Sequence, residues 1–343
     1  MTGGPKVTVA GAGALGLCSA LALVDAGCAV TLCDPLTQGR ASAVAAGMLA
    51  PVFEAALEPE TAAAFDLLIA ARDLWPGIEA RAGVALDRSG AMAVGDAGWL
   101  GGIGAALERL GVKAIDLPAV TIQALAPGLA ETIDHGLLVR EDWRLEPRPA
   151  LIALRKACDA AGVGWRQAAV EEVGEADWLV IATGAAEGLE RLAPELAALT
   201  PIKGQILRYM DIRGAGVSVR GEGVYAAPAS DGLAIGATME AGRRDTSPDA
   251  KALQPLLEAA TRLFPGLGQA TFGLAAGVRA ATPDGLPMAG FSAAPKVILA
   301  TGARRNGWLL APLVARVVAA CVTGGEAGPY ARRFDPRRFK DAP

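Results

Sequence analysis

The chain has 343 residues, of which 52% are hydrophobic and 20% are charged, a length typical of two domains with sizeable cores. Its 32 basic and 36 acidic residues give a formal net charge of −4, which provides no field that attracts a phosphate backbone, so nucleic acid is excluded as a partner. No uninterrupted apolar run reaches about 18 residues, and a strand begins by Lys6. We therefore expect a cytoplasmic protein without membrane contact.

The first predicted unit is a dinucleotide-binding fingerprint. An apolar strand from Lys6 to Ala10 leads into the turn Gly11-Ala12-Gly13-Ala14-Leu15-Gly16, and a helix follows to about Ala26. A second strand from Ala29 to Cys33 ends at the acidic residue Asp34. This order of strand, glycine turn, helix, strand and acid predicts a βαβ unit that holds a dinucleotide.

Each glycine of the turn has a physical role. Gly11 permits the tight turn, Gly13 lets the backbone approach a pyrophosphate, and Gly16 lets the helix pack closely on the sheet. The helix N-terminus then faces the phosphates. Asp34 can accept hydrogen bonds from ribose hydroxyls and would repel a 2′-phosphate, so NADP is disfavoured while FAD and NAD stay open. The alternative is a glycine-rich turn without function.

Small residues fill the next segment, from Ala41 to Pro51. They would let backbone amides approach a large flat ligand, although an ordinary alanine-rich helix start would look the same. Farther along, the pattern predicts helices from Thr61 to Trp75 and from Pro147 to Ala160, and a strand from Val163 to Val173.

Two buried strands end in the same Ala-Thr-Gly sequence, one at Asp177 to Gly184 and one at Val297 to Gly302. They indicate one nucleotide domain assembled from distant segments. Between them, short alternating strands from Pro201 to Ala237, a helix from Pro248 to Leu263 and a strand from Thr271 to Leu274 predict an antiparallel sheet with a helix. The second domain is therefore inserted into the first.

Five motifs together resemble the FAD-dependent amino acid oxidase family: Gly11 to Gly16, Ala45 to Leu49, Lys203-Gly204-Gln205, Arg279, and Arg305-Asn306-Gly307. Within that family the chain is most similar to the glycine oxidases of thiamine biosynthesis. The resemblance implies an α/β fold, in which an antiparallel α+β substrate domain is inserted into a Rossmann-like FAD-binding domain. We assign residues 1–83, 140–204 and 275–343 to FAD binding and residues 84–139 and 205–274 to the substrate domain.

The resemblance also implies noncovalent FAD, because the covalent attachment of related sarcosine oxidases needs a cysteine near the second half of the substrate domain, whereas Cys321 lies in the terminal helix. The loop before the terminal helix would contact the distal flavin ring, with the helix N-terminus favouring negative charge there. The positions expected to contact FAD are Gly11, Gly13, Ala14, Leu15, Gly16, Asp34, Ser42, Ala46, Gly47, Met48, Val170, Thr183, Gly184, Arg279, Arg305, Asn306, Gly307 and Trp308.

Three catalytic-site positions follow from the same resemblance. Arg279 would bind the substrate carboxylate with its planar fork, Tyr225 would donate its hydroxyl to the same group, and Met239 would shape the pocket. For Arg279 the alternative is a surface or interdomain salt bridge. The chain departs from the family pattern at Gly223 and at Ala303-Arg304. We expect the Arg304 side chain to be solvated, and the alternative is that it adds positive charge near the flavin or the substrate entrance.

The implied reaction is oxidation of glycine or another small amino acid, with molecular oxygen as the acceptor. Hydride leaves the α-carbon for the flavin, the imine is hydrolysed to a 2-oxo acid and ammonia, and oxygen is reduced to hydrogen peroxide. No histidine base is required, and the single histidine, His135, lies in a turn-like sequence. Scattered cysteines and one histidine predict no metal site. A homo-oligomer stays open.

Three alternatives also stay open. A D-amino acid dehydrogenase would pass electrons to a quinone or carrier, and a flavin-binding subunit would serve a larger complex. An NAD-linked dehydrogenase would share the first βαβ unit but would lack Arg305-Asn306-Gly307.

Overall fold

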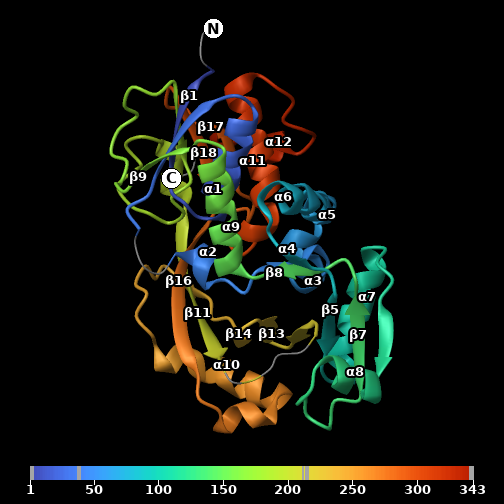
Figure 1. Ribbon diagram of the computed structural model, residues 1–343. Coiled ribbons are helices and arrows are strands. Elements are labelled where there is room, and N and C mark those ends of the chain that lie inside the picture. The colour runs from blue at the N-terminus through green and yellow to red at the C-terminus, as the bar shows by residue number, and fades with distance from the viewer. Residues whose placement is uncertain (1–3, 37–39, 211, 213–215, 340–343) are drawn as a thin grey trace.

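A six-stranded sheet forms the first layer of the computed structural model, which describes residues 4–36, 40–210, 212 and 216–339 (Figure 1). Four parallel strands make its centre, and their order is β18, β10, β1 and β2. A short parallel strand, β9, and an antiparallel strand, β17, form the two edges. The strands are β1 (Lys6–Ala10), β2 (Ala29–Cys33), β9 (Gly164–Arg166), β10 (Trp178–Ile181), β17 (Met288–Phe291) and β18 (Val297–Thr301).

Helices α1 (Ala14–Asp25), α9 (Pro147–Ala160) and α11 (Gly307–Thr323) pack beside this sheet (Figure 1). The helix α1 is apolar on most of its surface because it lies between the sheet, α9 and α11. Its Leu17 and Leu21 are fully buried in the same core as Leu310 of α11. The glycine turn that starts α1 is therefore held rigidly at the carboxyl end of β1.

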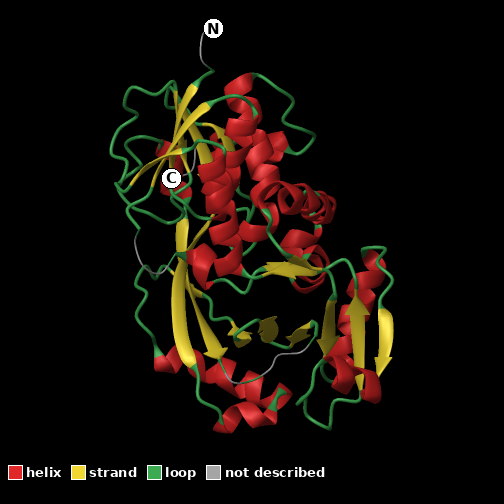
Figure 2. Cartoon of the chain, viewed as in Figure 1, coloured by secondary structure: helices red, strands yellow, loops and turns green. Residues whose placement is uncertain are grey.

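A larger sheet of nine strands forms the lower half of the molecule in Figure 2, and its strand pairs are antiparallel except for β12 with β5. The helix α10 (Ala250–Leu263) packs beneath it, and α7 (Ala97–Arg109) and α8 (Ala119–Leu125) lie at its far end. The strands are β5 (Ala91–Val94), β6 (Ile115–Pro118), β7 (His135–Val139), β11 (Thr200–Tyr209), β12 (Ser218–Gly221), β13 (Val224–Ala229), β14 (Gly232–Gly236), β15 (Glu240–Ala241) and β16 (Gly273–Ala281).

Short elements join the two sheets. The strands β3 (Met48–Leu49), β4 (Leu86–Asp87) and β8 (Trp143–Leu145) form a three-stranded ribbon. The remaining helices are α2 (Ala41–Val44), α3 (Pro51–Leu57), α4 (Pro59–Ala62), α5 (Phe65–Asp73), α6 (Trp75–Ala82) and α12 (Ala331–Phe334), with 3₁₀ turns at Pro194–Ala198, Pro265–Gln269 and Pro336–Phe339. Within the described ranges, no helix is long and apolar enough to cross a bilayer.

The sequence predicted the first βαβ unit, the helix from Pro147, the strand at Val297 and the mixed α/β class correctly, but three elements were wrong. The single helix predicted from Thr61 to Trp75 is divided among α4, α5 and α6 in the structure. The Thr61 hydroxyl donates to the Glu54 carbonyl oxygen of the preceding helix, and α4 ends directly afterwards, at Ala62. The strand from Val163 ends at Arg166, because β2 provides partners only as far as that residue. The strand placed at Thr271 to Leu274 runs instead over Gly273–Ala281, because it follows the ten-residue β11.

Candidate active site

The glycine turn opens into a cavity of about 500 Å³ at the carboxyl ends of the parallel strands, here called the nucleotide cavity. Gly11 has a φ of +100°, and a β-carbon there would stand 2.5 Å from the Ala182 carbonyl oxygen. A β-carbon at Gly16 would stand 1.9 Å from the Gly11 carbonyl oxygen. Both positions therefore require glycine, for the turn and for the close packing of α1 on it.

Polar groups in this cavity are arranged around the N-terminus of α1. The Ser42 Oγ accepts a hydrogen bond from the Ala14 amide at 3.0 Å. The buried Asp34 accepts from the Ala12 amide at 2.7 Å and lies 3.3 Å from Arg40. The glycine turn, helix N-terminus and carboxylate fit the pyrophosphate and ribose of a dinucleotide.

A second cavity of about 480 Å³, here called the active-site cavity, lies between the strands of the large sheet and the helices α2 and α3. Ala41 and Arg279 line both cavities, so the two cavities adjoin at these residues. The nucleotide cavity contains Gly11, Gly13, Ala14, Leu15, Asp34, Ser42, Val170, Thr183, Gly184 and Gly307. The active-site cavity contains Ala46, Gly47, Met48, Tyr225, Met239, Arg305, Asn306 and Trp308. Gly16 lines neither, since it lies beneath the turn.

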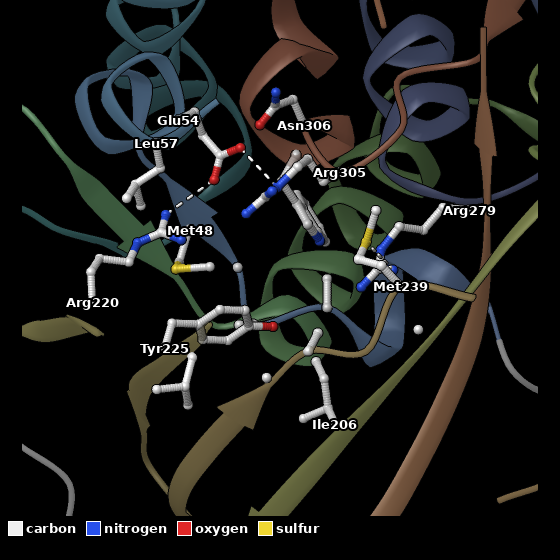
Figure 3. A pocket seen from close by; sticks show the side chains of 18 of the residues that line it. Met48, Glu54, Leu57, Ile206, Arg220, Tyr225, Met239, Arg279, Arg305 and Asn306 are labelled. Carbon is white, nitrogen blue, oxygen red and sulfur yellow. Dashed lines mark hydrogen bonds and ion pairs between the residues drawn. The ribbon is translucent and has the colours of Figure 1, made fainter. Parts of the chain in front are cut away.

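One row of residues across the large sheet forms the floor of the active-site cavity. Arg220 pairs with Tyr225, Tyr225 with Gly236, and Gly236 with Ile206, so the four residues share a face on adjacent strands. All four line the cavity. Figure 3 shows Tyr225 between Arg220 on one side and Arg279 on the other.

Arg279 comes from β16, and its guanidinium lies over the backbone of Gly204 on the neighbouring strand. A β-carbon at Gly204 would stand 2.1 Å from the Arg279 Nη1. Among the described residues, that nitrogen donates to the Thr238 carbonyl oxygen, at the long distance of 3.4 Å, and to the Met239 Sδ, a weak acceptor, also at 3.4 Å. Burial lowers the pKa of Arg279, with Tyr225 opposing the effect. Among the described residues this guanidinium has no carboxylate partner, so it is not the surface salt bridge considered from the sequence.

Tyr225 is buried, and burial raises the pKa of its hydroxyl. Among the residues described, the hydroxyl has no hydrogen-bond partner. It lies over Gly236, where a β-carbon would stand 2.2 Å from the Tyr225 oxygen. A neutral tyrosine hydroxyl held in this way can donate to an anion in the cavity.

Two carboxylates that the sequence did not single out form an ion-pair cluster above the floor. Glu54 of α3 lies 3.1 Å from the Arg220 Nη2 and 2.9 Å from the Arg305 Nε, as the dashed lines of Figure 3 mark. Glu58 lies 2.6 Å from the Arg305 Nη1 and 3.7 Å from Arg304. The prediction that Arg304 is solvated is therefore wrong: its side chain is only 20% exposed, because Glu58 draws it inward.

The loop before α11 is fixed by this cluster and by Trp308. The Trp308 indole nitrogen donates to the Ser42 carbonyl oxygen at 3.0 Å, which connects the loop to the nucleotide cavity. Asn306 is the N-cap residue of α11 and is buried. The family departures lie close by: Gly223 lines the active-site cavity, and Ala303 and Arg304 line the nucleotide cavity.

Asp142 positions the helix that carries Glu54. Its buried carboxylate accepts hydrogen bonds from the Val52 and Phe53 amides at 2.7 and 3.0 Å, at the N-terminus of α3. Burial raises the pKa of Asp142 to about 7, although Arg220 and the two amides oppose the shift. This role has no local signal, because Asp142 lies beside Glu141 in a charged segment and its amide partners are 90 and 89 positions earlier in the chain.

Together these features define a class of protein in which a dinucleotide-binding turn at the end of a parallel strand adjoins a second cavity, lined by cations, on a neighbouring sheet. Residues 6–321 match the family described as FAD dependent oxidoreductase. The chain belongs to this family and is an FAD-dependent oxidoreductase.

Individual relatives are similar to this chain in sequence over most of its length. It is 29% identical to the glycine oxidase of Pseudomonas putida, covering 95% of this chain and 98% of that protein. It is 31% identical to the bifunctional protein ThiO/ThiG of Trichormus variabilis, over 97% of this chain but only 55% of the relative. The chain thus spans about half the length, or less, of the bifunctional relatives it matches. The crystal structure of glycine oxidase from Geobacillus kaustophilus superposes with a TM-score of 0.83 at 25% identity, covering 97% of this chain and 99% of that one.

Proposed function

We propose that this protein oxidises glycine or another small amino acid with FAD, releasing a 2-oxo acid and ammonia and reducing oxygen to hydrogen peroxide. The observation that carries the proposal is Arg279, a half-buried guanidinium without a carboxylate partner among the described residues, where the two cavities meet. A partly buried cation of this kind is stabilised by an anion, and a substrate carboxylate would supply one. The names of the glycine oxidase and ThiO relatives support the substrate class and a place in thiamine biosynthesis.

Each proposed role follows from the position of the residue. Arg279 binds the carboxylate through its fork, and the Tyr225 hydroxyl donates to the same group from the floor. Met239, 3.4 Å from Arg279, limits the space beside it. This fixes the α-carbon in one orientation, so that its hydrogen faces the cofactor.

Bound FAD would supply the hydride acceptor, while the chain supplies binding and electrostatics. We propose that the cofactor positions named from the sequence hold it noncovalently, with Gly11, Gly13 and Asp34 at the adenosine half. The N-terminus of α11 would place partial positive charge beside the distal ring, and Arg305 would hold the loop before it through its ion pairs with Glu54 and Glu58. We also retain the division into an FAD-binding and a substrate domain as a proposal.

The experiment is a visible spectrum of the purified protein, followed by anaerobic addition of glycine, sarcosine and D-alanine. Flavin bands that bleach with one of them support the proposal, and bands that persist with every amino acid tested contradict it. Arg279→Ala should retain the flavin bands but lose bleaching at millimolar substrate. Peroxide formation under air separates an oxidase from a dehydrogenase, and acid precipitation that releases all colour establishes noncovalent FAD.

A further inference from the structure

The proposed function leaves one cation of the active-site cavity without a role. Arg220 lies on β12, lines this cavity and is only 2% exposed. A guanidinium has five N–H donors and a charge that it retains at any physiological pH. Its burial is costly unless several acceptors surround it.

The acceptors around Arg220 are too few. Its Nη2 donates to the Glu54 Oε1 at 3.1 Å, and its Nε is fully buried without an acceptor in the part of the chain that the structure describes. Glu54 is also shared, because the Arg305 Nε lies 2.9 Å from its other oxygen. Glu58 approaches Arg305 instead of Arg220. Asp142 also contributes charge near Arg220, but its oxygens accept from the Val52 and Phe53 amides. Among the described residues, the acceptor that Arg220 has is therefore a carboxylate that it shares with Arg305, which points to a ligand acceptor.

The sheet places Arg220 where a substrate bound by Arg279 would extend. Arg220 and Tyr225 are direct cross-strand partners, and the Arg220 Cζ lies 5.7 Å from the centre of the Tyr225 ring. In Figure 3, Arg220 and Arg279 stand on opposite sides of Tyr225. Because all three side chains line one cavity, a molecule held at one end by Arg279 and the tyrosine hydroxyl can extend its other end toward Arg220. Gly223, in the turn between β12 and β13, also lines this cavity, and a β-carbon there would meet no atom within 4 Å.

We infer that Arg220 recognises a second carboxylate of the substrate, so that the preferred substrate is a small amino acid with two carboxylates. The inference rests on the proposed function and narrows its substrate class. A carboxylate matches the donor fork of Arg220, and it would give Arg220 an acceptor that is not shared with Arg305. The second carboxylate could belong to the side chain, as in D-aspartate, or to the nitrogen substituent, as in N-carboxymethylglycine.

The test compares each dicarboxylate with its neutral counterpart on the holoenzyme. We expect kcat/KM for D-aspartate to exceed that for D-asparagine, or that for N-carboxymethylglycine to exceed that for sarcosine, by about tenfold or more. The pair with the larger ratio identifies where the second carboxylate lies. Arg220→Met should bring that ratio to near one, and Arg220→Lys should retain part of it. The matched control is Arg140→Met, an exposed arginine outside the cavity, which should leave the ratio unchanged.

If the wild type oxidises the neutral amino acids and the ratio of kcat/KM for each dicarboxylate to that for its neutral counterpart is near or below one, the inference is overturned. The proposed function would then still stand. If no amino acid bleaches the flavin, the proposed function fails, and ligand binding then decides the role of Arg220. Succinate should perturb the flavin spectrum at a concentration about tenfold below butyrate in the wild type, and the two should act equally in Arg220→Met. Equal binding of both acids to the wild type would overturn the inference, as would an unchanged preference in a folded, yellow Arg220→Met.

Discussion

The guanidinium of Arg279 lies directly over the α-carbon of Gly204, with space for nothing larger than hydrogen between them. A β-carbon at Gly204 would stand 2.1 to 2.4 Å from the Arg279 Nη1, Nη2 and Cζ atoms. The two residues lie on adjacent strands, β11 and β16, so neither backbone can move away easily. Gly204 therefore determines where Arg279 holds its fork.

Replacing Gly204 with alanine should displace the Arg279 guanidinium while leaving the sheet intact, because alanine is acceptable within a strand. We expect KM for the amino acid to rise about tenfold or more, since a displacement of about 1 Å can cost 100-fold in rate. Steady-state kinetics measures the change, and the flavin spectrum checks folding. Gly273→Ala is the control on β16, because its β-carbon would meet only the Arg208 carbonyl oxygen at 3.9 Å. Equal KM values for the two variants would contradict the prediction.

The features that could be predicted from the sequence are those formed by residues close together in the chain. The first βαβ unit was placed almost to the residue, because its glycine turn and apolar strands act within about thirty residues. The strand of Arg279 was misplaced, because its alanine and glycine residues carry little pattern and its length is set by β11, far away in the chain. The Glu54–Arg220 pair could not be predicted, since it joins residues 166 positions apart through the packing of α3 on the large sheet.

The nucleotide cavity gives a second prediction, at Gly13. A β-carbon there would stand 3.1 Å from the Ser42 Oγ at the N-terminus of α1. Gly13→Val would fill the space next to the helix amides that the pyrophosphate needs. We expect the Kd for FAD to rise about tenfold or more, measured by fluorescence titration of the apoprotein. In Gly101→Ala, on α7, the added carbon meets nothing within 4 Å, and FAD affinity should not change.

The ion-pair cluster gives a third prediction. Glu54→Ala leaves the buried Arg220 without its carboxylate, so the free energy of unfolding should fall by about 3–5 kcal/mol. Adding Arg220→Met should recover part of that loss, because the buried charge is then gone, and urea unfolding of the single and double variants gives the coupling energy. The control is the exposed pair Arg81–Asp25, at 2.8 Å, where Asp25→Ala should cost no more than about 1 kcal/mol. Additive losses in the double variant would exclude the coupling.

The buried carboxyl of Asp142 gives the last prediction, on pH. Burial raises its pKa to about 7 in the folded protein, so between about pH 4 and pH 7 the folded state binds more protons at this site than the unfolded chain. Its contribution to stability is therefore complete below about pH 4 and is lost as the pH rises through 7, with a total of up to about 4 kcal/mol.

The Asp142→Asn variant cannot titrate at this position, so the wild type should exceed the variant in unfolding free energy by more at pH 5 than at pH 8. Urea unfolding of the FAD-bound proteins at both values measures this difference. A wild-type advantage that is constant or grows with pH would show that the carboxyl is charged throughout and that its hydrogen bonds to the amides of Val52 and Phe53 outweigh burial.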